Sequence, residues 1–281
     1  LVVAVAVAMA FRAYFLQPFK IPTGSMQPTL YGIHSVARAQ PGAWDRIPLK
    51  YLKWVALGEW YREVRVRVPG GLEGPYIAGQ DDPAVCFYDV GPIRYRVPKD
   101  AMIPYPRGTY LEVGTLMWSG VVTAGDHVFV DKVRWNFRRP SRGCIMVFST
   151  DGIQGLIKGT HYIKRMMGVP GDELSIDTPY VVVNGTPARE PEAVRKISER
   201  EPPYDAYPYA YGYIPPTGPE ASYLRTPQEK VKLAPGEYFG LGDNTSNSRD
   251  SRYWGVVPHR NLVGPGVIVY WPFSNRWGLT E

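Results

Sequence analysis

Ser25 is a residue of this sequence whose hydroxyl could act as a nucleophile. It stands in IPTGSMQPTL directly after Gly24, and a glycine lets a substrate backbone approach closely. A serine hydroxyl is a weak nucleophile until a base removes its proton. Judged on this segment alone, an ordinary loop serine is the better interpretation, so the chemistry depends on a base elsewhere in the chain.

Lys164 is the candidate for that base. It lies in the apolar stretch YIKRMMGVPGD, and a lysine in apolar surroundings is partly desolvated, which lowers its pKa. To act near neutral pH, it must lose about 3 units from the reference value of ~10.4. The alternative is a lysine that extends its charged head to water at a strand edge. The sequence alone does not place Lys164 beside Ser25.

A polar loop is the third segment whose side chains could take part in chemistry. GLGDNTSNSRDSRYWGVVP, at residues 240–258, concentrates small polar and charged side chains between two apolar stretches. Such a loop must satisfy its own hydrogen bonds, and Asp250 with Arg252 suits a charge-assisted pair. A solvated hairpin loop is the simpler alternative. A calcium loop is another, but the acidic spacing does not match the EF-hand pattern.

The elements that must position these residues are mainly β-strands. The 281 residues include 29 Gly, 28 Pro and 20 Tyr, which indicates many turns and short, half-buried strands. Alternation at Val64, Val66 and Val68 predicts one strand. Further strands are expected within 85–98, 110–118, 126–135, 144–150, 161–169, 173–185, 237–243 and 266–273. The stretch 70–83 is expected to be a loop.

Two long segments interrupt this framework. We expect one catalytic domain over residues 20–281, an antiparallel β-sheet or barrel-like core with insertions at about 37–119 and 186–235. The second insertion is rich in Pro, Tyr and Glu, with PYDAYPYAYGYIPP at its centre. It suits a tyrosine-rich flap.

The N-terminal segment predicts a membrane anchor. LVVAVAVAMAF is uninterrupted by charge until Arg12, and a full span needs about 20 apolar residues. Because the chain starts at Leu1, we expect residues 1–19 to be the later part of a transmembrane helix from a longer gene product. The helix should end near Pro18. A cleaved signal peptide and a buried core helix are the alternatives.

Charge and cysteine content exclude several classes of function. The net charge of +6 comes from dispersed residues without an aromatic–basic repeat, so no nucleic-acid partner is expected, and anionic lipid headgroups explain the excess better. Cys86 and Cys144 permit one disulfide without implying it, and they match no zinc spacing. Without an HExxH motif, the four histidines give no reason to expect a metal or any other cofactor.

The chain resembles the bacterial type I signal (leader) peptidases, Ser-Lys peptidases that remove signal peptides from exported proteins. The blocks that carry the resemblance stand in the family's order and cover about half of the chain: FLQPFKIPTGSMQPTL, GDHVFVDK, RGCIMVF, YIKRMMGVPGD and GDNTSNSRDSRYWG.

The resemblance implies a role for each matched residue. Ser25 corresponds to the nucleophile and Lys164 to the neutral lysine base. Thr23 stands where a side-chain hydroxyl forms the oxyanion hole together with the backbone N–H of the serine. Such a donor stabilises the transition state by on the order of 3 kcal/mol. Ser248 stands where a serine hydroxyl orients the lysine.

The other matched residues are implied to shape or brace the site. Met26 would help to form the substrate pocket beside the nucleophile. Asp243, Asp250 and Arg252 would be structural residues of the last loop.

Two departures from the family's pattern concern the surroundings of the site. Thr245 and Ser246 replace an arginine and the residue that follows it, and Arg249 is a candidate to compensate. The segment 142–144 reads Arg-Gly-Cys where the family has Arg-Gly-Asp, so a carboxylate is lost.

Histidine bases are the chemical alternative to Lys164. His161 precedes Lys164 by three residues, so strand alternation would direct the two to opposite faces. His34 is near Ser25 in sequence but lies in a turn-like stretch. A Ser-Lys mechanism is therefore the expectation.

Three classes of function remain open. The first is a membrane-bound peptidase that cleaves signal-peptide-bearing precursors, located in the inner (cytoplasmic) membrane with its catalytic domain on the outer, periplasmic side. The second is a Ser-Lys processing peptidase dedicated to one partner. The third is a non-catalytic, membrane-tethered binding module.

Overall fold

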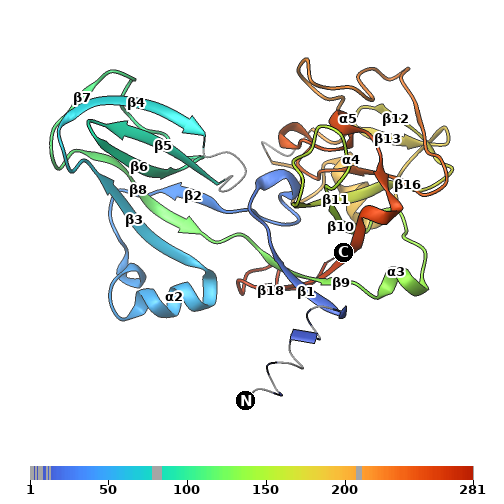
Figure 1. Cartoon of the computed structure of the whole chain (residues 1–281), viewed down its shortest axis with the longest axis horizontal. Helices are drawn as coiled ribbons and strands as arrows, with labels where there is room; N and C mark the ends of the chain where they lie inside the picture. The colour runs from blue at the N-terminus through green and yellow to red at the C-terminus, as the bar shows by residue number, and fades with distance from the viewer. Residues whose placement is uncertain are drawn as a thin grey trace.

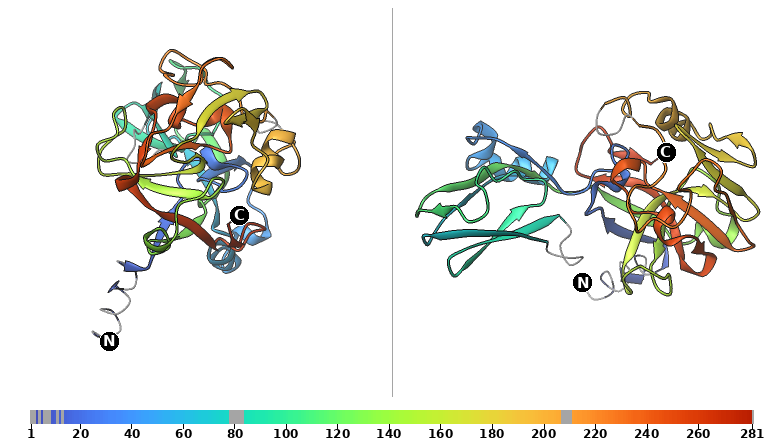
Figure 2. Two further views of the ribbon diagram at one scale, coloured as in Figure 1. Left: turned by 90° about the vertical axis from the view of Figure 1, so that its right-hand side faces the viewer. Right: turned by 90° about the horizontal axis from the view of Figure 1, so that it is seen from above.

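The computed structural model describes residues 14–77, 84–206 and 211–280, together with positions 3, 5, 9, 10 and 12. Two lobes make up the chain (Figure 1), and the view from above separates them as well (Figure 2, right). The larger lobe contains the described chain up to about residue 33 and everything after about residue 124. The smaller lobe contains the intervening residues.

One curled sheet forms the framework of the larger lobe. Its strands, in spatial order, are β1 (Leu16–Lys20), β9 (His127–Asp131), β18 (Leu262–Trp271), β10 (Ile145–Ser149), β11 (His161–Gly168), β16 (Glu237–Leu241) and β17 (Val257–Pro258), with β19 (Gly278–Leu279) paired to β18. All of these pairs are antiparallel. Register shifts interrupt β10–β18, β11–β16 and β18–β9. Such bulges bend strands, which is consistent with the curl of this sheet.

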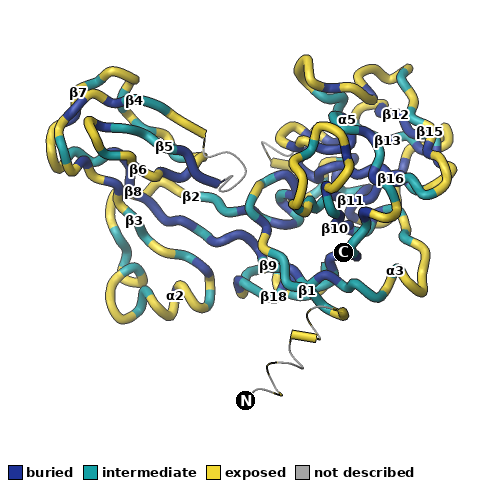
Figure 3. Tube along the Cα trace, viewed as in Figure 1, coloured by how far each residue is buried: buried dark blue, intermediate teal, exposed yellow. Residues whose placement is uncertain are grey.

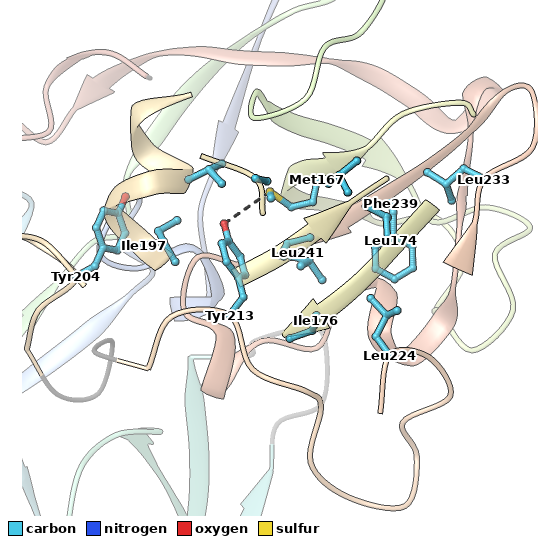
Figure 4. Close-up of a cluster of buried hydrophobic side chains, with 14 residues drawn as sticks. Met167, Leu174, Ile176, Ile197, Tyr204, Tyr213, Leu224, Leu233, Phe239 and Leu241 are labelled. Carbon is cyan, nitrogen blue, oxygen red and sulfur yellow. Dashed lines mark hydrogen bonds between the residues drawn. The ribbon is translucent and has the colours of Figure 1, made fainter. Parts of the chain in front are cut away.

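A second sheet covers the far end of the larger lobe. Its order is β14 (Thr186–Pro187), β13 (Tyr180–Val183), β12 (Glu173–Asp177) and β15 (Val231–Lys232). Helix α4 (Glu192–Glu199) packs beside it with Val194 and Ile197 fully buried. Figure 4 shows the hydrophobic cluster between these elements, where the hydroxyl of Tyr213 donates to Met167 Sδ at 3.7 Å. The expected flap is therefore packed, in part, into the core.

The smaller lobe consists of two sheets around their own core. One has the order β2 (His34–Ala37), β8 (Leu116–Thr123), β3 (Glu59–Arg65), and the other β6 (Ile93–Pro98), β5 (Val85–Val90), β4 (Gly70–Ile77), β7 (Tyr110–Leu111). Its buried cluster includes Val64, Leu72, Val97 and Met117. The insertion expected at about 37–119 falls within this lobe.

Short helices complete the chain. They are η1 (Gly24–Met26), η2 (Ala43–Asp45), α2 (Leu49–Leu57), α3 (Arg134–Phe137), η3 (Thr245–Asn247), α5 (Ser251–Trp254) and η4 (His259–Asn261).

The prediction of a mainly antiparallel β fold is confirmed. The loop predicted over 70–83 is wrong for its first part, because β4 runs from Gly70 to Ile77 and pairs with β5. A register shift between Glu73 and Tyr76 accommodates the Gly-Pro step, so pairing with a neighbouring strand overrides the local turn signal.

The predicted anchor over 1–19 falls partly on residues outside the described ones. Positions 3, 5, 9, 10, 12 and 14 are helical and β1 starts at Leu16. Within the described part of the chain, no helix combines the length and the apolar character needed to span a bilayer.

Candidate active site

Ser25 lies in η1, the single turn that follows the buried Ile21 after β1. The extended backbone of Thr23 (φ −122°, ψ 159°) leads into this turn, and Ser25 itself is 8% exposed. The polar loop holds the turn from the other side. The Asn244 N–H donates to the Ser25 carbonyl at 3.1 Å, and Asn244 Nδ2 donates to the Gly24 carbonyl at 3.1 Å.

Lys164 reaches Ser25 from the middle of β11. Its Nζ donates to Ser25 Oγ at 2.7 Å and to the Ile163 carbonyl at 2.9 Å. The lysine is 4% exposed and lies opposite Met146 in the neighbouring strand β10. The structure thus brings together two residues that the sequence alone does not place in contact.

Burial determines the protonation behaviour of Lys164. Loss of hydration lowers the pKa of Lys164 to about 8, while the carboxylates of Asp250 and Asp243 partly oppose this effect by stabilising the ammonium form. Arg252 lowers the pKa further. The neutral amine, the form able to accept a proton, is therefore accessible close to neutral pH.

Arg252 organises the loop behind the lysine. Its guanidinium donates to both carboxylate oxygens of Asp250 at 2.8 Å, to the Ile214 carbonyl at 2.7 Å and to the Thr245 carbonyl at 2.8 Å. Asp250 also accepts the Gly242 N–H at 3.0 Å. The charge-assisted pair anticipated from the sequence is present, with both partners buried.

Arg249 does not take over the missing arginine's position in the loop. It is exposed and pairs with Glu220 at 3.1 Å on the surface. Thr245, which stands in the arginine's place, instead donates its hydroxyl to the Gly212 carbonyl at 2.7 Å. The inserted segment therefore supplies part of the loop's support.

Asp243 belongs to a second buried network, which sequence reasoning missed. Arg165 donates to its two oxygens at 2.8 and 2.6 Å, and the Thr29 hydroxyl donates to Asp243 as well. Thr29 also shares a 2.5 Å hydrogen bond with the Tyr204 hydroxyl. Arg165 directly follows Lys164 in a strand, and a charged pair in an otherwise apolar strand was the available signal.

The turn at residues 142–144 lacks the family's carboxylate, and other contacts hold it in place. Arg142 pairs with Asp172 at 2.8 Å, and the Gly143 carbonyl accepts from Arg165 at 2.6 Å. Burial raises the pKa of the Cys144 thiol to about 11. Cys144 and Cys86 are both free cysteines, so the permitted disulfide is absent.

The remaining predicted residues lie around the dyad. Thr23 is exposed next to Ser25. Ser248 is buried, and its Oγ has no hydrogen-bond partner in the described part of the chain. A Cβ on Gly242 would come within 2.1 Å of that Oγ and 2.5 Å of the Ser25 carbonyl oxygen, so glycine permits this close packing. Met26 is fully buried among Ile21, Leu30 and their neighbours, behind the serine.

The histidines contact other groups. His161 packs against the Phe19 ring at 5.2 Å, and His34 shares a 2.9 Å hydrogen bond with the Gly32 carbonyl. Across the described ranges, the titratable side chain that is hydrogen-bonded to Ser25 Oγ is Lys164. The same residues contain no group of three or more His, Cys, Asp or Glu that could hold a metal ion.

Comparison with known proteins gives consistent matches. Residues 116–271 match the family model described as "Signal peptidase, peptidase S26", a range that includes Lys164 and the polar loop but not Ser25. The "Probable signal peptidase I-2" of Synechocystis sp. is 31% identical over 201 residues, which is 63% of this chain and 80% of that protein. The "Signal peptidase I" of Leptolyngbya laminosa is 31% identical over 192 residues, 67% of this chain and 72% of that protein.

A solved structure is also similar. It is a signal peptidase I from Enterococcus faecalis V583, 20% identical, with a TM-score of 0.30 over 46% of this chain and 97% of the other.

Proposed function

Because the chain belongs to the bacterial type I signal peptidases, the serine peptidases of family S26, we propose that Ser25 and Lys164 form a catalytic dyad that removes signal peptides from exported precursors. The single observation that carries the dyad is the 2.7 Å contact between Lys164 Nζ and Ser25 Oγ in a buried setting. The lowered pKa of Lys164 supports it, because a lysine must be neutral to act as a base.

The reaction follows from this geometry. Neutral Lys164 accepts the proton of Ser25 while Ser25 Oγ attacks the scissile carbonyl carbon. The Ser25 N–H and the Thr23 hydroxyl stabilise the oxyanion. The Lys164 ammonium then protonates the leaving amine, which frees the mature protein and leaves an acyl group on Ser25. Lys164 next removes a proton from water, and the water hydrolyses the ester.

The supporting residues act on the position of the lysine. Ser248 lies beside Gly242, and within the described part of the chain its Oγ has no hydrogen-bond partner. We propose that this hydroxyl orients the amine of Lys164. The two buried networks around Asp243 and Asp250 hold the loop against the nucleophile's turn. Met26 is fully buried against Ile21 and Leu30, so its proposed influence on the substrate pocket is indirect, through the position of that turn.

Residues 1–19 are proposed to anchor the protein in the inner membrane, with residues 20–281 on the outer side. The uninterrupted apolar run before Arg12 supports an anchor. An anchor would keep Ser25 near the bilayer surface, where the end of a signal helix emerges, and would raise the local concentration of substrate.

The dyad is tested by replacing Ser25 with alanine. Ser25→Ala should abolish cleavage of a signal-peptide-bearing precursor, and it should also abolish labelling by a serine-directed acylating probe. Ser175→Ala is a matched control, since Ser175 is also 8% exposed but lies in β12 of the second sheet. Undiminished cleavage by Ser25→Ala would exclude Ser25 as the nucleophile.

A further inference from the structure

Helix α2 of the smaller lobe presents its apolar side chains to the outside. Leu52 is 61% exposed and Trp54 51%, and Tyr51 and Val55 are exposed to a similar degree. Figure 3 shows the helix and the turn before it coloured mostly as exposed. A helix on the surface of a water-soluble domain normally places such residues against the core.

The inner side of the same helix is charged. Lys53 is only 8% exposed, and its Nζ pairs with Asp45 at 2.7 Å and with Glu59 at 3.0 Å. Asp45 also accepts from Arg38 at 2.9 Å. The amphipathic pattern of α2 is therefore inverted, because its ionic groups are satisfied inside and its apolar groups are left outside.

The apolar surface continues beyond α2. Trp44 and Ile47, in and just after η2, are exposed as well. We call these two residues with Tyr51, Leu52, Trp54 and Val55 the α2 face. The end of β18 adjoins it, since Trp271 Nε1 donates to the Val55 carbonyl at 2.6 Å and the Phe273 N–H donates to the Ala56 carbonyl at 2.9 Å.

The charges beside the α2 face are cationic. Arg46 is exposed next to Ile47, and Lys50 Nζ lies 5.0 Å from the centroid of the Tyr51 ring. The nearby acidic groups, Asp45 in η2 and Glu59 at the start of β3, are paired with Lys53. Tryptophan, tyrosine and aliphatic side chains bordered by lysine and arginine are typical of helices that lie in the headgroup region of a bilayer.

The position of α2 fits the same partner. Where the structure describes it, the helical segment before β1 lies on the side of the molecule where α2 lies, in Figure 1 and in the left view of Figure 2. The described part of the apolar N-terminal segment and helix α2 are thus on the same side of the molecule.

We propose that the α2 face lies in the boundary between headgroups and acyl chains of a phospholipid bilayer, as a membrane contact separate from the N-terminal segment. The contact belongs to the smaller lobe, which lies almost entirely before the residues that match the family model. It does not depend on the chemistry of Ser25 and Lys164, so its test is independent of activity.

The test places an environment-sensitive fluorophore on the α2 face of the full chain. Leu52→Cys is labelled with nitrobenzoxadiazole and mixed with phosphatidylcholine vesicles, with or without phosphatidylglycerol. Tyr110→Cys is the matched control, since Tyr110 is 63% exposed but lies on β7 at the other end of the lobe. The unmutated chain, with its buried Cys86 and half-buried Cys144, gives the labelling blank.

The label at position 52 should show a several-fold rise and a blue shift in emission with vesicles. Phosphatidylglycerol should strengthen both effects, and lipids with a nitroxide near the headgroup should quench them. The label at position 110 should keep the emission intensity and wavelength that it has without vesicles. Tyr51→Cys provides a second site on the same face should Leu52→Cys disturb the fold.

Three results would overturn the proposal. Labels at 51 and 52 that do not respond to vesicles would show that the face stays in water. Equal responses at 52 and 110 would show unspecific adsorption. A concentration-dependent change without lipid would assign the face to a second copy of the chain.

Discussion

Lys164 shows how one environment sets the reactivity of one side chain. Its amine is removed from water, which favours the neutral form, yet the carboxylates of Asp243 and Asp250 act in the opposite direction. The balance leaves the pKa at about 8, well below an ordinary lysine. A weaker burial would leave the amine protonated, and a stronger one would reduce its ability to accept a proton.

The pH dependence of cleavage should report this value. If neutral Lys164 is the base, kcat/KM rises about tenfold per pH unit below the pKa, because the neutral fraction does. The rise should level off above about pH 8. Initial rates on a precursor between about pH 5.5 and 9.5, a range that brackets the pKa of Lys164, provide the measurement. A plateau reached by about pH 6.5 would instead indicate a histidine base.

Residue identities were the most predictable part of the site. The motifs around Ser25 and Lys164 suggested both residues, and the structure places the two in contact. Arg165, Thr29 and Tyr204 were not predicted. The position of Arg165 beside Lys164 in an apolar strand was a local signal, but the partners of Thr29 and Tyr204 lie in distant segments and leave no local pattern.

The loop between β16 and α5 owes its shape to one arginine. Arg252 satisfies Asp250 and the carbonyls of Ile214 and Thr245, so it joins the loop to the inserted segment. These groups are buried, and removal of the arginine would take a donor from each carbonyl and leave Asp250 with backbone N–H donors but without its cationic partner.

Arg252→Met should therefore destabilise the protein by about 3–5 kcal/mol, since it leaves Asp250 as an unpaired buried charge. Arg249→Met is the control, because its exposed pair with Glu220 is worth roughly 0–1 kcal/mol. Urea unfolding of both variants, followed by tryptophan fluorescence, gives the comparison. Similar losses for the two would mean that the loop does not depend on the buried pair.

Strands with a clear apolar pattern were predictable from the sequence. Two elements without such a pattern, α2 and β4, were not. Strands β9, β10 and β11 lie inside the ranges expected from their apolar runs. Helix α2 was not predicted, because its Lys53 faces inward and its apolar residues face outward. Strand β4 contains Gly-Pro, and only its partner strand makes it extended.

The two lobes are joined at the end of β18 as well as by the chain itself. Trp271 donates to the Val55 carbonyl of α2, and its ring lies so close to Gly58 that a Cβ there would be 2.7 Å from it. Gly58 also has a φ of +64°, which ends α2. This junction could not be read from the sequence, because it joins residues more than two hundred positions apart.

Trp271→Phe should loosen the junction. The loss of one hydrogen bond worth about 1 kcal/mol predicts roughly fivefold faster amide exchange at the end of α2 and at the Phe273 N–H. Trp277→Phe, a change in an exposed residue of the same segment, is the control. Hydrogen exchange measured by mass spectrometry should separate them, and equal rates would show that the indole does not hold the lobes together.

The polar loop's contacts with the nucleophile's turn have a consequence for biosynthesis. Ser25 meets Lys164 across 139 residues, Thr29 meets Asp243 across 214, and Asn244 reaches Gly24 across 220. A chain emerging from the ribosome thus presents Ser25 long before the residues that hold it exist. The proposed dyad can therefore be held in place only after the last quarter of the chain, which contains Asp243 and Asn244, has folded against the turn of Ser25.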